Sequence, residues 1–383
     1  MISGRFQNWH RLSGRFSFVL ACFSLATTGR AVEPLTVLTY NLGGNGVADW
    51  STNSPKVQAI GREVRYLQPD VLALQEVPFT NTWQMANFVT AFFPGFFLAT
   101  NSGTDGYVRS AILSRFPIVR SQKWLDGVTL TNFGFAGNFT RDLFEAEINV
   151  PGFEKPLHVF TTHLKSRQDA TSSARHAAEA RAISNWLVTA FLPSKGDRPY
   201  LLTGDLNEDV QRPSTAGGST LPTLVSAPTG LRLTTPTNSA ASRELTWSTG
   251  APGFQKRYDY ILPCGLLFSN IAASEVFRAD ALTNPPPPLR TNDTVAASDH
   301  APVVMWFHNP YNVPFALLSL SLSNQTVALR WESAAGRRYR VETSSNLASW
   351  SVVASNLGAA GTVFEWRTNG AEAWRFFRVH RTP

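Results

Sequence analysis

Runs of aliphatic and β-branched residues along the chain predict strands, and amphipathic segments between the runs predict helices. Residues 35–42 alternate between the two faces expected of a strand. Residues 70–77 form a mostly aliphatic run that is typical of a strand buried on both faces. Between them, Ser54 as N-cap and Pro55 in the first turn begin a helix with one apolar stripe. This alternation of strands and helices predicts a layered α/β core.

The same pattern continues to about residue 307. Residues 201–209 predict a short buried strand that ends in a glycine and then places Asp205 and Asn207 on the same side. Residues 211–242 are rich in Pro, Thr, Ser and Gly and predict long loops, as in a lid or rim. Further helices are expected at residues 82–93 and 172–191, and further strands at 106–118, 139–148, 157–164, 245–247, 257–262 and at the end of 297–307.

The composition changes beyond a linker expected around residues 308–314. The tail has no Lys and no Asp, is rich in Ser, Arg and aromatic residues, and alternates apolar and polar positions over several short runs. This pattern predicts a small all-β sandwich over residues 310–383, which follows a first folded domain over residues 32–309.

Residues 1–31 have the layout of a secretory signal peptide. Arginines open the segment, residues 16–26 form a short apolar run, and residues 29–31 supply small residues at the usual cleavage spacing. We therefore expect export, with the mature protein secreted or held in the periplasm or cell envelope. Loss of the leader removes Cys22 and leaves Cys264, which we expect to be a buried small apolar residue.

The formal net charge of +7 is unevenly distributed. Residues 1–31 hold four Arg and no acid, and residues 312–383 hold eight Arg and four Glu. Removing these from the totals of 34 basic and 27 acidic residues leaves 22 and 23 for residues 32–311, a net charge of −1. The overall charge is therefore weak support for a polyanionic partner, although a clustered basic face is compatible with zero net charge.

Polar side chains stand where the aliphatic runs stop. They are carboxylates, amides and imidazoles: Asn41, Glu76, His163, Asp205, Asn207, Asp259, Asp299 and His300. Hard oxygen ligands of this kind suit Mg²⁺, with Mn²⁺ or Ca²⁺ as alternatives. Activation of water beside such an ion is the chemistry of phosphate-ester hydrolysis. Taken singly, each residue also has a structural interpretation, such as a turn residue for Asn41 or a core histidine for His163, His158 and His176.

The chain resembles the endonuclease/exonuclease/phosphatase superfamily, also called the deoxyribonuclease-like fold. The resemblance covers roughly residues 35–307 and implies a four-layer α/β/β/α sandwich that cleaves phosphoesters with a metal ion. It is carried, in the order of the family, by Thr39-Tyr40-Asn41, Leu74-Gln75-Glu76, Ala111-Ile112-Leu113-Ser114, Thr162-His163-Leu164, Gly204-Asp205-Leu206-Asn207, Tyr258-Asp259-Tyr260-Ile261 and Ser298-Asp299-His300-Ala301-Pro302. The tail loosely resembles fibronectin type III modules, which implies attachment to a cell surface or matrix, or a spacer role, rather than catalysis.

The resemblance also implies metal-site roles. Glu76 would be the main metal ligand, and Asn41 and Asp299 would lie near the ion. Pancreatic-type deoxyribonucleases carry a Glu two residues after a Tyr to pair with the residue equivalent to His163. Here Arg109 holds that position after Tyr107.

The remaining matched residues would act on water and phosphate. Asp205 would orient or deprotonate the attacking water, and Asn207 would hold that water or the phosphate. Asp259 would fix the tautomer of His300, which would serve as base or phosphate donor. His163 would bind the phosphate or protonate the leaving oxygen. Arg109 and Arg141 are candidates for a phosphate clamp, with structural ion pairs as the equal alternative.

The substrate class stays open between nucleic acid and phospholipid. The near-neutral domain lowers the case for a nonspecific nuclease, which usually needs phosphate-neutralising cations. A phospholipid or sphingomyelin diesterase, or a phosphatase, of the same fold is the alternative, and an exposed aromatic hairpin at residues 132–139 would support a lipid enzyme. A catalytically silent binding protein on this scaffold is the non-enzyme alternative, and it predicts damaged ligands. No obligate protein partner is inferred.

Overall fold

The computed structural model describes residues 34–44, 47–79, 82–101, 107–213, 219–238, 243–250, 253–311, 315–369 and 376–382. Contacts divide the chain into a first unit, Val32–Asn312, and a C-terminal unit that starts at Val313. The expected leader at residues 1–31 lies outside the described residues and stays a prediction.

The first unit contains two sheets. The first sheet has the strand order β10-β11-β1-β2-β4-β3. Strands β1 and β2 run parallel, whereas β11 lies antiparallel to β1 and β4 antiparallel to β2. The bounds are β1 (Leu35–Asn41), β2 (Val71–Pro78), β3 (Phe97–Thr100), β4 (Val108–Ser114), β10 (Ile271–Val276) and β11 (Val303–Phe307).

The second sheet has the strand order β5-β6-β7-β8-β9. Strands β7 and β8 run parallel, and β9 lies antiparallel to β8. The bounds are β5 (Ile118–Trp124), β6 (Leu143–Ile148), β7 (Leu157–His163), β8 (Tyr200–Asp205) and β9 (Asp259–Pro263).

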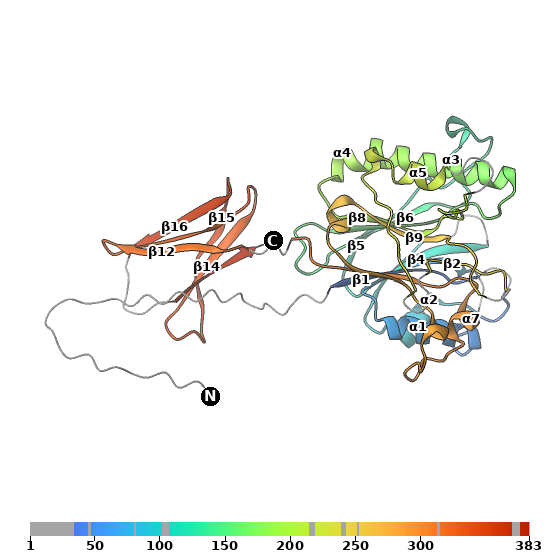
Figure 1. Cartoon of the computed structure of the whole chain (residues 1–383), viewed down its shortest axis with the longest axis horizontal. Helices are drawn as coiled ribbons and strands as arrows, with labels where there is room; N and C mark the ends of the chain where they lie inside the picture. The colour runs from blue at the N-terminus through green and yellow to red at the C-terminus, as the bar shows by residue number, and fades with distance from the viewer. Residues whose placement is uncertain are drawn as a thin grey trace. The chain divides into compact units, whose positions relative to one another are not determined.

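Helices cover the outer face of each sheet (Figure 1). The first sheet is covered by α1 (Pro55–Leu67), α2 (Met85–Phe92) and α7 (Asp293–Ala297), and the second by α3 (Ala170–Trp186), α4 (Leu192–Lys195) and α5 (Thr220–Leu224). A π-helical turn, Leu187–Phe191, joins α3 to α4, and α6 (Gly265–Phe268) and short 3-10 turns complete the unit. The predicted four-layer α/β/β/α fold is confirmed.

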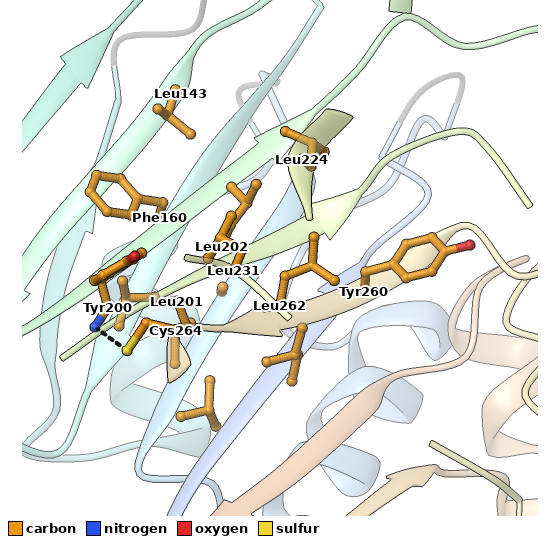
Figure 2. Packing of buried hydrophobic residues seen from close by; sticks show 14 of the residues in the cluster. Leu143, Phe160, Tyr200, Leu201, Leu202, Leu224, Leu231, Tyr260, Leu262 and Cys264 are labelled. Atoms are coloured by element: carbon orange, nitrogen blue, oxygen red, sulfur yellow. Dashed lines mark hydrogen bonds between the residues drawn. The ribbon is translucent and has the colours of Figure 1, made fainter. Parts of the chain in front are cut away.

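Alternation along each strand divides the core into apolar layers on the two faces of each sheet. In β1, Val37 belongs to the cluster between the sheets and Leu38 to the cluster under α1 and α2. Figure 2 shows part of the core around the second sheet, where Leu201 and Leu202 of β8 pack among buried aromatic and aliphatic residues. Leu202 lies opposite Phe160, which packs against Trp186 of α3, so Leu201 takes the other face of the sheet. Cys264 lies buried there and its Sγ accepts a bond from the Tyr200 N–H at 3.5 Å, so it is the small core residue expected.

Several elements differ from the sequence prediction. The strand expected at 106–118 is two strands, β4 and β5, which belong to different sheets. The chain turns between them, where Ser114 Oγ accepts a hydrogen bond from the Phe116 N–H. Pro117 follows, and it has no backbone N–H to donate to a neighbouring strand. Residues 245–247 form only isolated bridges, those of Trp247 with Lys256 and His300. Strand β10 and helix α7 were not predicted.

The C-terminal unit is all-β, as predicted. One sheet has the order β12-β13-β16 and the other β15-β14-β17. The bounds are β12 (Leu317–Ser323), β13 (Thr326–Glu332), β14 (Arg338–Ser344), β15 (Ser351–Gly358), β16 (Val363–Asn369) and β17 (Phe376–Thr382). A separate small core forms around Leu329, Trp331, Tyr339 and Val341. Across the described residues of both units, every helix is too short or too polar to cross a membrane.

Candidate active site

Strand register brings the polar strand ends to one edge of the two sheets. Asp205 at the end of β8 lies opposite His163 at the end of β7 and opposite Asp259 at the start of β9. In the facing sheet, Asn41 at the end of β1 lies opposite Gln75 of β2. Residues separated by more than a hundred positions in the sequence therefore meet across the inter-sheet space.

Asp205 is the centre of this cluster. Its Oδ2 accepts from Asn41 Nδ2 at 2.9 Å and lies 3.5 Å from His163 Nε2 and 3.7 Å from His300 Nε2. Its Oδ1 accepts from the Asn207 N–H at 2.9 Å. Burial raises the pKa of Asp205, and the facing imidazole of His300 opposes that rise. A carboxylate of this kind is a stronger proton acceptor than an exposed aspartate.

Backbone geometry sets the direction of Asp205 and Asn207. Gly204 has a φ of +131°, and a Cβ placed on it would lie 1.9 Å from the carbonyl oxygen of Thr162, so only glycine fits. Asn207 adopts a left-handed φ of +51°. Its Nδ2 donates to the carbonyl of Leu164 at 3.1 Å, which fixes the amide beside the end of β7.

His300 and Asp259 form a buried imidazole–carboxylate pair. His300 Nδ1 and Asp259 Oδ2 are 2.8 Å apart, and the Asp259 N–H donates to Thr246 Oγ1. Burial alone would lower the pKa of His300, but the charge of Asp259 and its hydrogen bond raise that pKa to about 10. The ring is therefore an imidazolium at neutral pH, with Nε2 turned toward Asp205.

Glu76 reaches the site through an irregular strand. The ladder between β2 and β4 shifts between Leu74 and Val77, and Glu76 takes a φ of +49° within that shift. The bulge turns its side chain toward the other sheet, with Oε1 at 3.5 Å from Asn41 Nδ2 and 3.8 Å from His163 Nδ1. Burial and the nearby Arg141 hold the pKa of His163 well below 6.5, so this ring is neutral.

Asp299 lies at the mouth of the site and is exposed. Ser298 Oγ donates to the carbonyl of Asn41 at 2.8 Å, which joins this segment to the end of β1. A Cβ on Gly43 would lie 2.9 Å from Asp299 Oδ1 and 3.3 Å from Lys56 Nζ, so the carboxylate and the ammonium share one small space. Burial lowers the pKa of Lys56, and the charges of Asp299 and Glu76 oppose that change.

The oxygen donors at this edge fit a divalent metal ion. Asp205, Asp259 and His300 offer atoms within 4.8 Å of one another. His300 is a poor ligand, however, because Asp259 holds its Nδ1 and the ring carries a proton. The carboxylates of Glu76 and Asp299 are the harder oxygen donors that Mg²⁺ prefers. Asn41 turns its Nδ2 toward Glu76, and its Oδ1 accepts from the Gly43 N–H at 2.9 Å.

Sequence reasoning missed two residues of the site region. Gln75 is fully buried, and its Nε2 donates to Thr161 Oγ1 in the facing sheet at 2.8 Å. Lys56 was missed as well, although one signal was available. A lysine in the first turn of a helix is unfavourable next to the positive end of the helix dipole, which suggests an acidic neighbour elsewhere.

The structure places the two candidate arginines differently. Arg141 Nη1 donates to the carbonyls of His163 and Leu164 at 3.1 and 3.2 Å, so it borders the site. Arg109 lies opposite Val77, and its guanidinium stacks on the Phe79 ring at 5.3 Å. Among the described residues, no hydrogen bond or ion pair joins Arg109 to His163.

The four-layer α/β/β/α fold and the polar residues at one edge of its two sheets together define a scaffold of the phosphoester-hydrolase type. The model of the endonuclease/exonuclease/phosphatase family matches residues 38–300, and the chain belongs to this family. Members of this superfamily are phosphoester hydrolases and are generally metal-dependent. No curated protein sequence matches the chain.

Solved structures resemble the first unit at low sequence identity. An AP endonuclease from Archaeoglobus fulgidus matches with a TM-score of 0.50 at 15% identity, covering 71% of this chain and 99% of that one. D. rerio TDP2 complexed with single-strand DNA product matches at 0.49 and 16%, covering 71% and 98%. Sphingomyelinase C from Streptomyces griseocarneus matches at 0.46 and 20%, covering 72% and 99%. Likeness at these identities concerns the fold alone.

Proposed function

We propose that this protein is an exported, Mg²⁺-dependent phosphodiester hydrolase, with Mn²⁺ or Ca²⁺ as alternative ions. One observation carries the proposal: two amide residues and two imidazoles, those of Asn41, Asn207, His163 and His300, converge around the carboxylate of Asp205. A binding protein that had lost catalysis would not need to keep this set intact. Export is supported by the leader pattern at residues 1–31.

A divalent cation at Glu76, with Asn41 and Asp299 beside it, would neutralise phosphate charge and lower the pKa of bound water. Asp205 accepts the proton of the attacking water, because burial raises its pKa and two hydrogen bonds fix its orientation. Asn207 lies two residues further on and positions that water or a phosphate oxygen.

The two histidines have different roles because their protonation differs. His300 is held as an imidazolium by Asp259, which favours donation of a hydrogen bond to a phosphate oxygen over service as a base. His163 is neutral, which favours phosphate binding over protonation of the leaving oxygen. Arg141 adds positive charge next to His163.

A phospholipid diesterase is the second candidate, and one observation weighs against it. In the loop at residues 132–139, Phe133 and Phe135 are partly buried and pack against the large core cluster of the first unit, next to α3. The Arg181 guanidinium donates to the Phe133 carbonyl at 2.8 Å and holds the loop on α3. The loop is therefore not the exposed aromatic hairpin that a lipid enzyme would use. For the C-terminal unit we propose attachment to a cell surface or matrix.

The test is hydrolysis of bis-p-nitrophenyl phosphate, plasmid DNA, RNA, inositol phosphates and sphingomyelin by purified protein with Mg²⁺, Mn²⁺, Ca²⁺ or EDTA. We expect EDTA to abolish hydrolysis and Glu76→Gln to lower it by about a hundredfold or more. Glu365→Gln, a carboxylate of the C-terminal unit, is the matched control. Full activity of Glu76→Gln, or of wild type in EDTA, would refute the metal mechanism.

A further inference from the structure

Four basic side chains gather beside His163, on the edge of the site next to α3. They are Arg141, Lys165, Arg167 and Arg175, called here the cationic rim. Arg141 precedes β6, Lys165 and Arg167 follow β7 directly, and Arg175 lies in the second turn of α3. The roles proposed for the catalytic residues use only Arg141 of these four.

A buried carboxylate fixes the rim in place. Glu179 of α3 is fully buried, and its Oε2 accepts from the Lys165 N–H at 2.7 Å. Its Oε1 accepts from the Thr140 N–H at 2.8 Å and lies 3.6 Å from Arg175 Nε. The segments that carry Arg141, Lys165 and Arg175 are therefore tied to one group, so the cations cannot move apart easily.

The rim has more positive than negative charge. Its four cations face three acids: the buried Glu179 and Asp142, and the exposed Asp169 at the start of α3. Burial raises the pKa of both Glu179 and Asp142. Burial and repulsion from three arginines of the rim lower the pKa of Lys165. Cations held this close favour a bound anion, which would remove the repulsion.

Two members of the rim are available to a ligand. Across the described part of the chain, neither the Lys165 ammonium nor the Arg167 guanidinium forms a hydrogen bond or an ion pair with the protein. Arg167 is exposed, and its left-handed φ of +80° belongs to the turn that joins β7 to α3. Both groups can therefore bind phosphate without breaking an existing contact.

We propose that the cationic rim is a second phosphate subsite, which binds a phosphate next to the scissile one and makes a nucleic-acid strand the substrate. The proposal rests on the proposed function and names its substrate class. A polynucleotide carries phosphates on both sides of the cleaved bond, whereas a phospholipid or a simple diester carries one phosphate and leaves the rim unused. The near-neutral charge of the whole domain does not oppose this, because the cations are concentrated at one place.

The experiment compares Lys165→Ala/Arg167→Ala with the matched control Lys155→Ala/Lys195→Ala in the full chain. Lys155 and Lys195 lie at the opposite end of the second sheet and carry the same formal charge. Binding of a fluorescent single-stranded 12-mer is measured by anisotropy in EDTA between 50 and 300 mM salt. Hydrolysis of the 12-mer, of bis-p-nitrophenyl phosphate and of sphingomyelin in anionic vesicles is then measured with Mg²⁺.

Loss of two phosphate contacts should weaken 12-mer binding about tenfold at low salt and make the salt slope shallower by about 1.4. Hydrolysis of bis-p-nitrophenyl phosphate should change less than twofold, and the control should resemble wild type. Equal losses on both substrates, or an equal effect of the control, would overturn the subsite. Losses confined to sphingomyelin in anionic vesicles would also overturn it and point to a membrane surface. Rim-dependent binding without hydrolysis of any phosphoester would support the subsite and refute the proposed function.

Discussion

Glu63 offers a prediction whose size follows from the structure. This carboxyl group of α1 is fully buried behind the site and accepts hydrogen bonds from the hydroxyls of Tyr40 and Thr294. Burial raises the pKa of Glu63 from 4.5 to about 7, although the two hydroxyl hydrogen bonds oppose the rise. The neighbouring Asp293 adds to it. The folded protein therefore holds a neutral Glu63 in mildly acidic solution.

The sign of the effect on stability follows from this raised pKa. Between pH 4.5 and 7 the folded state binds a proton that the unfolded state has released, so stability is lost as pH rises through about 7. The difference between the two pKa values corresponds to about 3 kcal/mol of unfolding free energy. Most of this amount, about 2 to 3 kcal/mol, is lost between pH 5 and pH 8.

Glu63→Gln removes the ionisation and keeps the size of the side chain. The amide can accept from one hydroxyl and donate to the oxygen of the other, so the local hydrogen bonds survive. Relative to wild type, the variant should therefore gain about 2 to 3 kcal/mol in unfolding free energy between pH 5 and pH 8. Urea unfolding at several pH values measures the gain, and other titrating groups cancel because both proteins contain them.

Asp126→Asn is the control for removal of one negative charge at an exposed position. Its stability relative to wild type should change little with pH. If Glu63→Gln and wild type differ by the same free energy at pH 5 and pH 8, Glu63 is ionised in the folded protein at both values. That outcome would refute a pKa of Glu63 raised by burial.

Three further predictions concern the site. Gly204→Ala should cost about 3 kcal/mol or more in urea unfolding, because its Cβ would lie 1.9 Å from the Thr162 carbonyl oxygen; a loss below about 1 kcal/mol would contradict the close packing. Asp205→Asn should lower kcat by about a thousandfold or more with Tm within a few degrees of wild type, and retained turnover would remove Asp205 from proton transfer. His300→Gln should lower kcat by at least about a hundredfold while it keeps a donor for Asp259, and a matching collapse of Tm would indicate a structural role instead.

The candidate site residues could be identified from sequence because each interrupts a local pattern. Asn41, Glu76 and Asp205 follow aliphatic runs, where an uncompensated polar side chain is costly. The alternation of strands and helices likewise indicated the layered fold, since periodicity is set by neighbouring residues. These signals required no knowledge of which strands pair.

Other features depended on contacts between distant segments. In the sequence, Arg109 holds the position at which pancreatic-type deoxyribonucleases carry a glutamate. In the structure, its guanidinium lies on the Phe79 ring, because the pairing of β4 with β2 decides which side each residue faces. The bulge that turns Glu76 into the site arises in the same ladder. A role for Lys56 at the site was not predicted, because its acidic neighbour Asp299 is more than two hundred residues away in the sequence.

The sequence by itself therefore determined most of the elements, their order and the polar residues at the strand ends, but not β10, α7 or the division of residues 106–118 into β4 and β5. Only the tertiary structure decided how those residues are paired, which imidazole is charged and which is neutral, and where cations cluster in a domain with almost no net charge. The physical reason is that secondary structure follows from local periodicity, whereas burial and electrostatic environment are sums over neighbours that strand pairing brings together.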